Sequence, residues 1–205
     1  MIKVVVYDCD GVIVESSQSI LAYYDWMMKK CDLPPIDWTE KDIKQKALSM
    51  ADKDILELLS KGDNNLYQKM LSISRDDEIN NSFFNMTLED NIIDGLTIVK
   101  NKNLPIAIFT NRGKSLPLLI KHFKIDKFFN FLVTSGDVSL PKPSPEGLIK
   151  ISNYFNVETN ELLFIGDSTT DYYAAKNCGA NFIAFKKPLY DSVIIYNHKE
   201  IENFI

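Results

Sequence analysis

The sequence predicts an α/β protein in which a doubly wound, Rossmann-like parallel sheet carries an inserted α-helical cap domain. From about residue 94 onward, short apolar runs alternate with helical stretches, which is typical of parallel strands joined by crossover helices. Residues 16–88 differ, because they lack β-branched runs and space their apolar side chains as helices do. We therefore expect an α/β core made of residues 1–15 and 89–205, interrupted by the cap at 16–88.

The first strand is predicted at residues 2–7, a mostly apolar run that suits a buried parallel strand. Asp8 and Asp10 follow it directly. Because side chains alternate along a strand, both carboxylates are expected on one side, with Cys9 turned away and Gly11 allowing a sharp turn. Buried carboxylates are costly unless a cation or hydrogen bonds compensate them. The two acids therefore indicate a site of chemistry.

The inserted segment is expected to fold into successive helices. The second and third of these are predicted to start at capping boxes, Thr39 with Asp42 and Ser49 with Asp52, and Gly62 is expected to end the third. The first helix is expected to present an apolar face formed by Ile20, Leu21, Tyr24, Met27 and Met28.

The remaining strands of the sheet are read from short buried runs after residue 94. They are predicted at 104–109, 129–134, 161–165 and 181–185, with helices near 95–102, 115–123, 145–155 and 169–178. Polar residues follow these strands at Thr110, Asn111, Lys142, Asp167 and Asp171. Since ligands of open α/β sheets bind outside the carboxyl ends of the strands, these residues are expected to share one site.

Four segments in this order resemble the motifs of the haloacid dehalogenase-like hydrolase superfamily. They are Asp8-x-Asp10-Gly11-Val12, Phe109-Thr110-Asn111, Lys142-Pro143-Ser144-Pro145 and Gly166-Asp167-Ser168-Thr169-Thr170-Asp171. Each motif is weak alone, but the four together, each after a predicted strand, are specific. The helical insertion lies where one class of that superfamily carries a mobile cap, and the chain is similar to its phosphoglycolate phosphatase and β-phosphoglucomutase branch.

The resemblance implies that Asp8 is a nucleophile that becomes an aspartyl phosphate. Asp10 would be the general acid for the leaving oxygen and later the base for water, so its pKa is expected to rise toward neutrality. The implied cofactor is Mg²⁺, held by Asp8, Asp167 and the backbone carbonyl of Asp10, with Asp171 supporting the metal through water or hydrogen bonds.

The resemblance also assigns the phosphate-binding residues. Thr110 would donate its hydroxyl to a phosphate oxygen beside the backbone N–H of Asn111, and Lys142 would supply positive charge to phosphate and nucleophile. Ser144 is expected to cap the helix that follows. Two roles are possible for Arg112, which could contact the substrate or form an ion pair with an acid on a helix surface.

The predicted function is that of a phosphoric monoester hydrolase acting on a small phosphorylated metabolite, similar to phosphoglycolate or a sugar phosphate. A phosphosugar mutase is the alternative, although mutases of the family carry a cap histidine and residues 16–88 contain none. A noncatalytic protein that binds a phosphorylated ligand is the alternative from another class. The cap lysines Lys44, Lys46 and Lys53 are candidates for binding a distal anionic group of the substrate.

Composition narrows the partners. The chain has 23 basic and 28 acidic residues, a net charge of −5 and no long basic cluster, so neither nucleic acid nor an anionic membrane is expected as a partner. Three cysteines without metal-ligand spacing fit a reducing compartment, and the chain shows no signal-peptide pattern. These features predict a cytoplasmic protein, and they leave its oligomeric state open.

Overall fold

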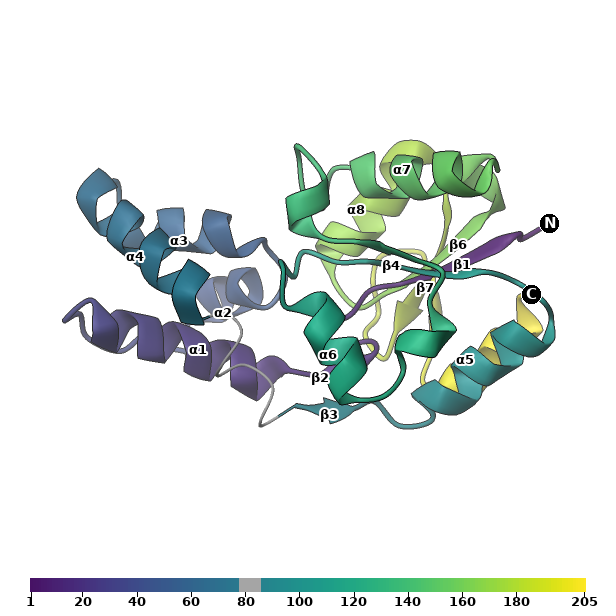
Figure 1. Ribbon diagram of the computed structural model, residues 1–205, viewed down its shortest axis with the longest axis horizontal. Coiled ribbons are helices and arrows are strands. Elements are labelled where there is room, and N and C mark those ends of the chain that lie inside the picture. The colour runs from purple at the N-terminus through teal and green to yellow at the C-terminus, as the bar shows by residue number, and fades with distance from the viewer. Residues whose placement is uncertain (78–85) are drawn as a thin grey trace.

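The computed structural model describes the backbone of residues 1–77 and 86–205, and the side chains of residues 1–73 and 86–205. Its core is a parallel sheet of six strands in the order β5-β4-β1-β6-β7-β8 (Figure 1). The strands are β1 (Val4–Tyr7), β4 (Ile106–Phe109), β5 (Phe131–Val133), β6 (Leu162–Gly166), β7 (Asn181–Phe185) and β8 (Val193–Ile195). The chain runs outward from β1 in both directions, which confirms the doubly wound α/β prediction.

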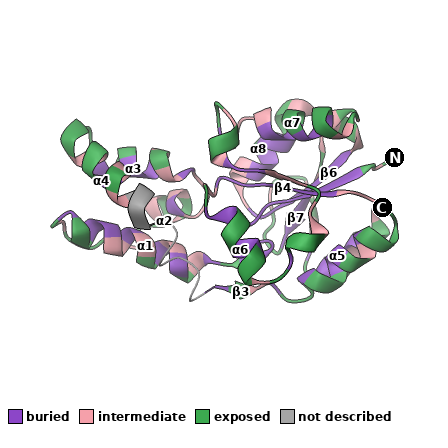
Figure 2. Cartoon of the chain, viewed as in Figure 1, coloured by how far each residue is buried: buried purple, intermediate pink, exposed green. Residues whose placement is uncertain are grey.

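Helices cover both faces of this sheet. Val5 and Tyr7 of β1 face a cluster that includes apolar residues of α5 (Ile92–Asn101) and α6 (Leu116–His122). Val4 and Val6 face the opposite cluster, where α7 (Glu146–Phe155) and α8 (Thr169–Cys178) pack. Because both faces are covered, β1 is buried along its whole length, as Figure 2 shows for the sheet.

The helices of the cap segment share an apolar core distinct from the two clusters that flank the sheet. They are α1 (Ser17–Lys30), α2 (Lys41–Ala47), α3 (Asp52–Ser60) and α4 (Asn64–Asp77), and they lie beside the sheet in Figure 1. The expected apolar face of α1 is present, with Leu21, Tyr24, Met27 and Met28 buried. A short antiparallel pair, β2 (Val14–Glu15) with β3 (Thr87–Leu88), joins these helices to the core.

Both capping boxes predicted for the cap are wrong. The N-cap residues are Glu40 for α2 and Ala51 for α3, and neither makes a side-chain capping bond. The hydroxyl of Thr39 instead donates to Asp37, and that of Ser49 donates to the carbonyl of Gln45 in the preceding helix. Thr39 lies one position and Ser49 two positions before the N-cap of the next helix, so neither hydroxyl stands at the capping position.

Other helix ends agree more closely with the predictions. α3 ends at Ser60, and Lys61 and Gly62 follow with φ of 52° and 85°, so the chain leaves the helix in the left-handed region. The N-cap of α7 is Pro145 rather than Ser144, although the Ser144 hydroxyl accepts a bond from the Glu146 N–H at 3.3 Å.

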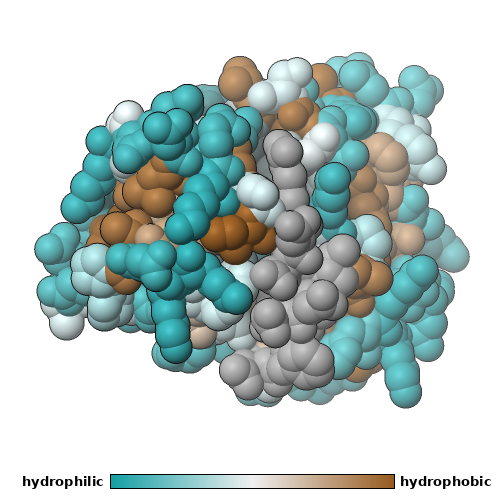
Figure 3. Space-filling model, turned by 60° about the vertical axis from the view of Figure 1, so that its left-hand side comes forward, coloured by the Kyte–Doolittle hydropathy of each residue, from teal (hydrophilic) through white to brown (hydrophobic). Residues whose placement is uncertain are grey.

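The surface of the cap side is mainly hydrophilic. Figure 3 shows this side turned toward the viewer, with hydrophobic patches between larger hydrophilic areas. Among the residues that the structure describes, no helix combines the length and apolar character needed to cross a membrane.

Candidate active site

The motif residues meet at the carboxyl ends of the central strands. Asp8 follows β1, Thr110 follows β4 and Asp167 follows β6. Tyr7, the last residue of β1, pairs in register with Ile108 of β4 and Ile165 of β6, so the three strands end at nearly the same level. The parallel register therefore brings residues that are about 100 to 160 positions apart in the sequence to one edge of the sheet.

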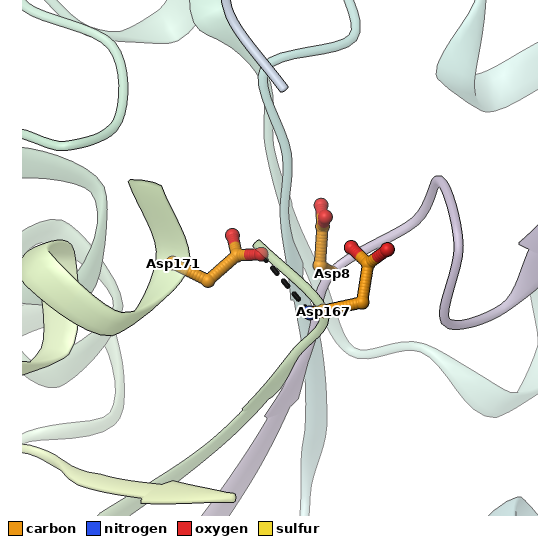
Figure 4. A group of neighbouring side chains, drawn as sticks. All are labelled: Asp8, Asp167 and Asp171. Atoms are coloured by element: carbon orange, nitrogen blue, oxygen red, sulfur yellow. Dashed lines mark hydrogen bonds between the residues drawn. The ribbon is translucent and has the colours of Figure 1, made fainter. Parts of the chain in front are cut away.

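Three carboxylates gather at this edge. Oxygens of Asp8, Asp167 and Asp171 lie within 4.8 Å of one another, and all three residues are buried (Figure 4). A Cβ placed on Gly11 would lie 2.3 Å from Asp167 Oδ2, so the turn after β1 closes on the cluster only because this residue is glycine. Gly11 also has a φ of 79°, which glycine adopts without strain. Buried carboxylate oxygens at this separation are suitable ligands for Mg²⁺.

Burial and mutual repulsion act on this cluster. Burial, together with the charge of Asp171, raises the pKa of Asp8 well above its usual value, although Lys142 opposes the shift. Burial raises the pKa of Asp167 to about 6, against the opposing charge of Lys187. A divalent cation would remove this cost, because it favours the ionised form of both carboxylates.

Two lysines compensate the negative charge. Lys142 Nζ lies 2.7 Å from Asp8 Oδ1 and 2.6 Å from Asp171 Oδ1. Burial alone would lower the pKa of Lys142, but the charges of Asp171 and Asp8 outweigh burial and raise the pKa above its usual value. Lys187 Nζ lies 2.5 Å from Asp167 Oδ2. Lys142 was among the predicted site residues, whereas Lys187 was not, and its only signal in the sequence is its place just after β7.

Asp171 is held by the protein on both of its oxygens. Oδ1 pairs with Lys142, while Oδ2 accepts bonds from the backbone N–H groups of Asp167 and Ser168 and from the Ser168 hydroxyl. The Ser168 hydroxyl in turn caps the start of α8. With both oxygens occupied, Asp171 is suited to position Lys142 and the loop of Asp167.

Asp10 is paired with Arg112. The Arg112 Nε donates to Asp10 Oδ2 at 3.0 Å and Nη2 donates to Oδ1 at 2.5 Å, which is a bidentate ion pair. Burial raises the pKa of Asp10, but the charge and hydrogen bonds of Arg112, aided by Ser16, leave it below its usual value. The expected rise of the Asp10 pKa toward neutrality is therefore wrong, because the guanidinium of Arg112 favours the ionised carboxylate.

The predicted phosphate-binding residues lie beside Asp8. Thr110 is buried, and its hydroxyl oxygen accepts a bond from the Arg112 N–H. The side chain of Asn111 accepts from the backbone N–H of Lys142 and donates to its carbonyl, at 2.9 and 3.1 Å. Asn111 therefore fixes the backbone of the residue that carries the buried ammonium, a role that the sequence analysis did not identify.

Asn111 also joins the core to the cap. Its Nδ2 donates to the carbonyl of Ser49 at 3.0 Å, and Thr170 Oγ1 donates to the same carbonyl at 3.3 Å. Ser49 lies in the connection between α2 and α3. Neither this carbonyl nor Thr170 was among the predicted site residues, and a backbone acceptor has no signal in the sequence.

A cavity lies between the cap helices and this edge of the sheet. It holds about 750 Å³ of space that opens to solvent. Asp8, Asp10, Thr110, Asn111 and Lys142 line it from the core, while α1 and the α2–α3 connection line it from the cap. The cap lysines 44, 46 and 53 are not among the lining residues, and Lys46 pairs with Asp42 instead. The expectation that they face the site is wrong.

Comparison with known proteins identifies the sequence family of this chain and several relatives. A family model described as haloacid dehalogenase-like hydrolase matches residues 5–185. Phosphoglycolate phosphatase of Escherichia coli strain K12 is 24% identical over 200 residues, covering 87% of this chain and 79% of the relative. Pyrophosphatase PpaX of Bacillus mycoides strain KBAB4 is 22% identical over 186 residues, covering 89% of this chain and 83% of the relative.

Solved structures share the fold. A HAD-superfamily hydrolase of subfamily IA from Geobacter sulfurreducens superposes with a TM-score of 0.75 at 27% identity, covering 99% of this chain and 96% of that one. A haloacid dehalogenase-like family hydrolase from Streptococcus pneumoniae gives 0.81 at 18% identity, covering 99% and 98%. Because the family match extends from β1 through the inserted helices to β7, the chain belongs to the haloacid dehalogenase-like hydrolases, as its motifs predict.

Proposed function

We propose that this protein is a Mg²⁺-dependent phosphatase that hydrolyses a small phosphorylated metabolite through an aspartyl-phosphate intermediate. The observation that carries the proposal is the position of Asp8, which lines the cavity with Lys142 beside it and with Asp167 and Asp171 behind it. The names of the curated relatives, phosphoglycolate phosphatase and pyrophosphatase, support phosphate chemistry.

Each residue has a role in this proposal. A carboxylate oxygen of Asp8 attacks phosphorus while the bond to the leaving oxygen breaks, and Asp10 protonates that oxygen. Asp10 then removes a proton from the water that attacks the aspartyl phosphate, releasing inorganic phosphate and free Asp8. Thr110, the Asn111 N–H and Lys142 would bind the phosphate oxygens.

Asp8, Asp167 and the carbonyl of Asp10 would hold Mg²⁺, which neutralises charge on the transferring phosphoryl group when it is bound. Asp171 would support this set without ligating the ion, since its oxygens are already taken by Lys142 and the loop of Asp167. The Arg112 pair must open for Asp10 to carry a proton, so the described arrangement corresponds to Asp10 before it has been protonated.

The partner we propose is a soluble small molecule rather than nucleic acid or membrane. The net charge of −5 is unfavourable for binding polyanions. We also propose a cytoplasmic location, supported by cysteines 9, 31 and 178, all of which are free thiols.

The test is release of inorganic phosphate from p-nitrophenyl phosphate with and without Mg²⁺. We expect activity only with the cation, and we expect Asp8→Asn to lower kcat by at least about 10³-fold because the nucleophile is lost. Asp54→Asn, which changes an acid of α3 outside the cavity, is the control and keeps its activity. Undiminished turnover by Asp8→Asn, or by the chelated protein, would contradict the proposal.

A further inference from the structure

The charge of the cavity differs between its two sides. On the cap side, the only charged residue among the described lining residues is the acid Asp52. A substrate with a second anionic group would therefore place that charge near a carboxylate, with no basic residue among the described cap residues that line the cavity to compensate it.

The two basic residues that line the cavity from the core, Lys142 and Arg112, already form ion pairs with aspartates. Lys142 contacts Asp8 and Asp171, and it belongs to the phosphate end of the cavity. Arg112 makes its bidentate pair with Asp10, and its Nη1 donates to the Ser115 hydroxyl at 3.3 Å. Binding a distal carboxylate or phosphate through Arg112 would require breaking this ion pair. The pair is largely buried, since the side chain of Arg112 is 8% exposed and that of Asp10 is 16% exposed.

A buried hydroxyl on the cap side lacks a partner. Ser19 of α1 lines the cavity and is 7% exposed, and its Oγ makes no hydrogen bond within the described protein. A buried polar group without a partner carries a cost that a bound ligand can relieve. The hydroxyl can both donate and accept, so its natural partner is another hydroxyl.

Aromatic rings stand next to this serine. Tyr23 follows Ser19 by four positions along α1, which places these two side chains on one side of the helix, and Tyr24 lines the cavity with them. The two rings meet edge to face at a centroid distance of 5.2 Å, and both line the cavity. Burial raises the pKa of Tyr24, as do the charge and a side-chain hydrogen bond of Asp52. Rings, hydroxyls and a carboxylate acceptor suit a ligand that has both C–H surface and hydroxyl groups.

We propose that the leaving group of the natural substrate is an uncharged polyhydroxylated alcohol, such as a polyol or sugar, and that Ser19 and Asp52 select it over carboxylate and phosphate analogues. This inference rests on the proposed phosphatase function and names its substrate class. It separates this chain from its relatives named for phosphoglycolate and pyrophosphate, both of which carry a second anionic group.

The test compares phosphate esters that differ at one group. Glycerol 3-phosphate and 3-phosphoglycerate differ only by a hydroxymethyl group in place of a carboxylate, and sorbitol 6-phosphate and 6-phosphogluconate differ in the same way. We expect kcat/KM, measured by phosphate release, to favour the uncharged member of each pair by at least about tenfold. Phosphoethanolamine, which carries an ammonium group, is expected to be turned over more slowly than glycerol 3-phosphate.

Substitutions of Ser19 and Asp52 test whether these two residues cause the preference for uncharged leaving groups. Ser19→Ala is expected to lower the ratio of kcat/KM between glycerol 3-phosphate and propyl phosphate by several-fold, because propyl phosphate has no hydroxyl to lose. Asp52→Asn is expected to narrow the gap between glycerol 3-phosphate and 3-phosphoglycerate. Ser60→Ala removes a buried cap hydroxyl that bonds the Glu57 carbonyl outside the cavity, and it should leave both ratios unchanged, as should Asp54→Asn.

The outcomes separate this inference from the function on which it rests. A protein that hydrolyses p-nitrophenyl phosphate but prefers 3-phosphoglycerate, pyrophosphate or phosphoethanolamine overturns the inference and leaves the phosphatase proposal standing. Equal rates within each pair overturn it as well. A protein that releases phosphate from none of these esters overturns both.

Discussion

Asp10 is the residue whose surroundings differ most from what its motif suggests. The motif gives it an acid's role, whereas Arg112 holds it as a carboxylate by a bidentate pair. The two residues are 102 positions apart, and they meet because Asp10 follows β1 and Arg112 follows the adjacent β4. This contact makes the protonation of Asp10 dependent on the position of one guanidinium.

We expect Arg112→Gln to shift the pH dependence of kcat/KM. Removing the guanidinium removes the charge that lowers the pKa of Asp10, so the acid stays protonated to higher pH and the alkaline limb of the profile moves to higher pH. The measurement needs an ester with a poor leaving group, such as ethyl phosphate, so that protonation of the leaving oxygen limits the rate. Arg112→Lys keeps the charge and should shift less, and an unmoved limb would exclude Asp10 as the acid.

His198 is a second buried group with an altered pKa. Its Nε2 lies 2.8 Å from the carbonyl of Val12, and its ring stacks on Phe185 at a centroid distance of 4.2 Å. Burial lowers the pKa of His198 to about 4, although the bond to Val12 opposes the shift. The neutral ring therefore holds the turn that carries Asp10 and Gly11 against the sheet.

The sign of the stability effect follows from this lowered pKa. Above about pH 6.5 the histidine is neutral in both states, whereas between 6.5 and 4 the unfolded chain binds a proton that the folded chain excludes. We expect the free energy of unfolding to fall by about 2 kcal/mol between pH 7.5 and 5 from this group alone. Urea unfolding of His198→Gln should lack that part of the loss, while His122→Gln, at an exposed position, should retain it. Equal losses in both variants would contradict the assignment.

At the scale of elements, one carbonyl of the α2–α3 connection links the cap to the core. Asn111 and Thr170, from the loops after β4 and at the start of α8, both donate to the carbonyl of Ser49. Asn111 differs from Thr170 in that it also bonds the backbone of Lys142 twice. The two residues therefore allow the cap contact to be separated from the positioning of the lysine.

We expect Thr170→Val to affect substrate binding more than turnover, because it removes the contact with the cap and a bond to the Ser168 hydroxyl at 2.8 Å, and leaves both bonds between Asn111 and Lys142 in place. Asn111→Ala should also lower kcat by about tenfold or more and lower the free energy of unfolding by about 1–3 kcal/mol, since it leaves backbone groups of the buried Lys142 without partners. Steady-state kinetics and chemical unfolding of both variants measure these effects. Indistinguishable kcat values for the two variants would show that Asn111 does not position Lys142.

At the scale of the whole molecule, the sequence predicted the sheet more fully than the cap. The strand at 181–185 was predicted with its observed bounds because β-branched and aromatic residues follow a helix that ends at a glycine. β8 was missed, since it has only three residues and does not stand out from a loop. In the cap, Thr39 and Ser49 have the residue types of helix caps, and only the structure shows that Asp37 and Gln45 already engage them.

In the site, the residues of the motifs were predicted from the sequence, whereas their contact partners were not. Residues that occur in motifs at strand ends, such as Asp8 and Asp167, were predicted because parallel strands end at one edge. Partners such as Arg112 for Asp10, Lys187 for Asp167 and the Ser49 carbonyl for Asn111 depend on contacts between distant segments. Side-chain type alone does not specify such contacts, and they decide the pKa of the acid and the contact between cap and core.

The β2–β3 pair affects how the inserted segment between these strands can evolve. The chain leaves the core at residues 14–15 and returns beside the same point at residues 87–88. Any insertion whose two ends meet can replace the present one without rerouting a strand of the sheet, so the part that chooses the alcohol and the part that breaks the phosphoester bond are free to diverge separately. Descendants of such a protein can thus change their substrate specificity while the residues at the strand ends stay the same.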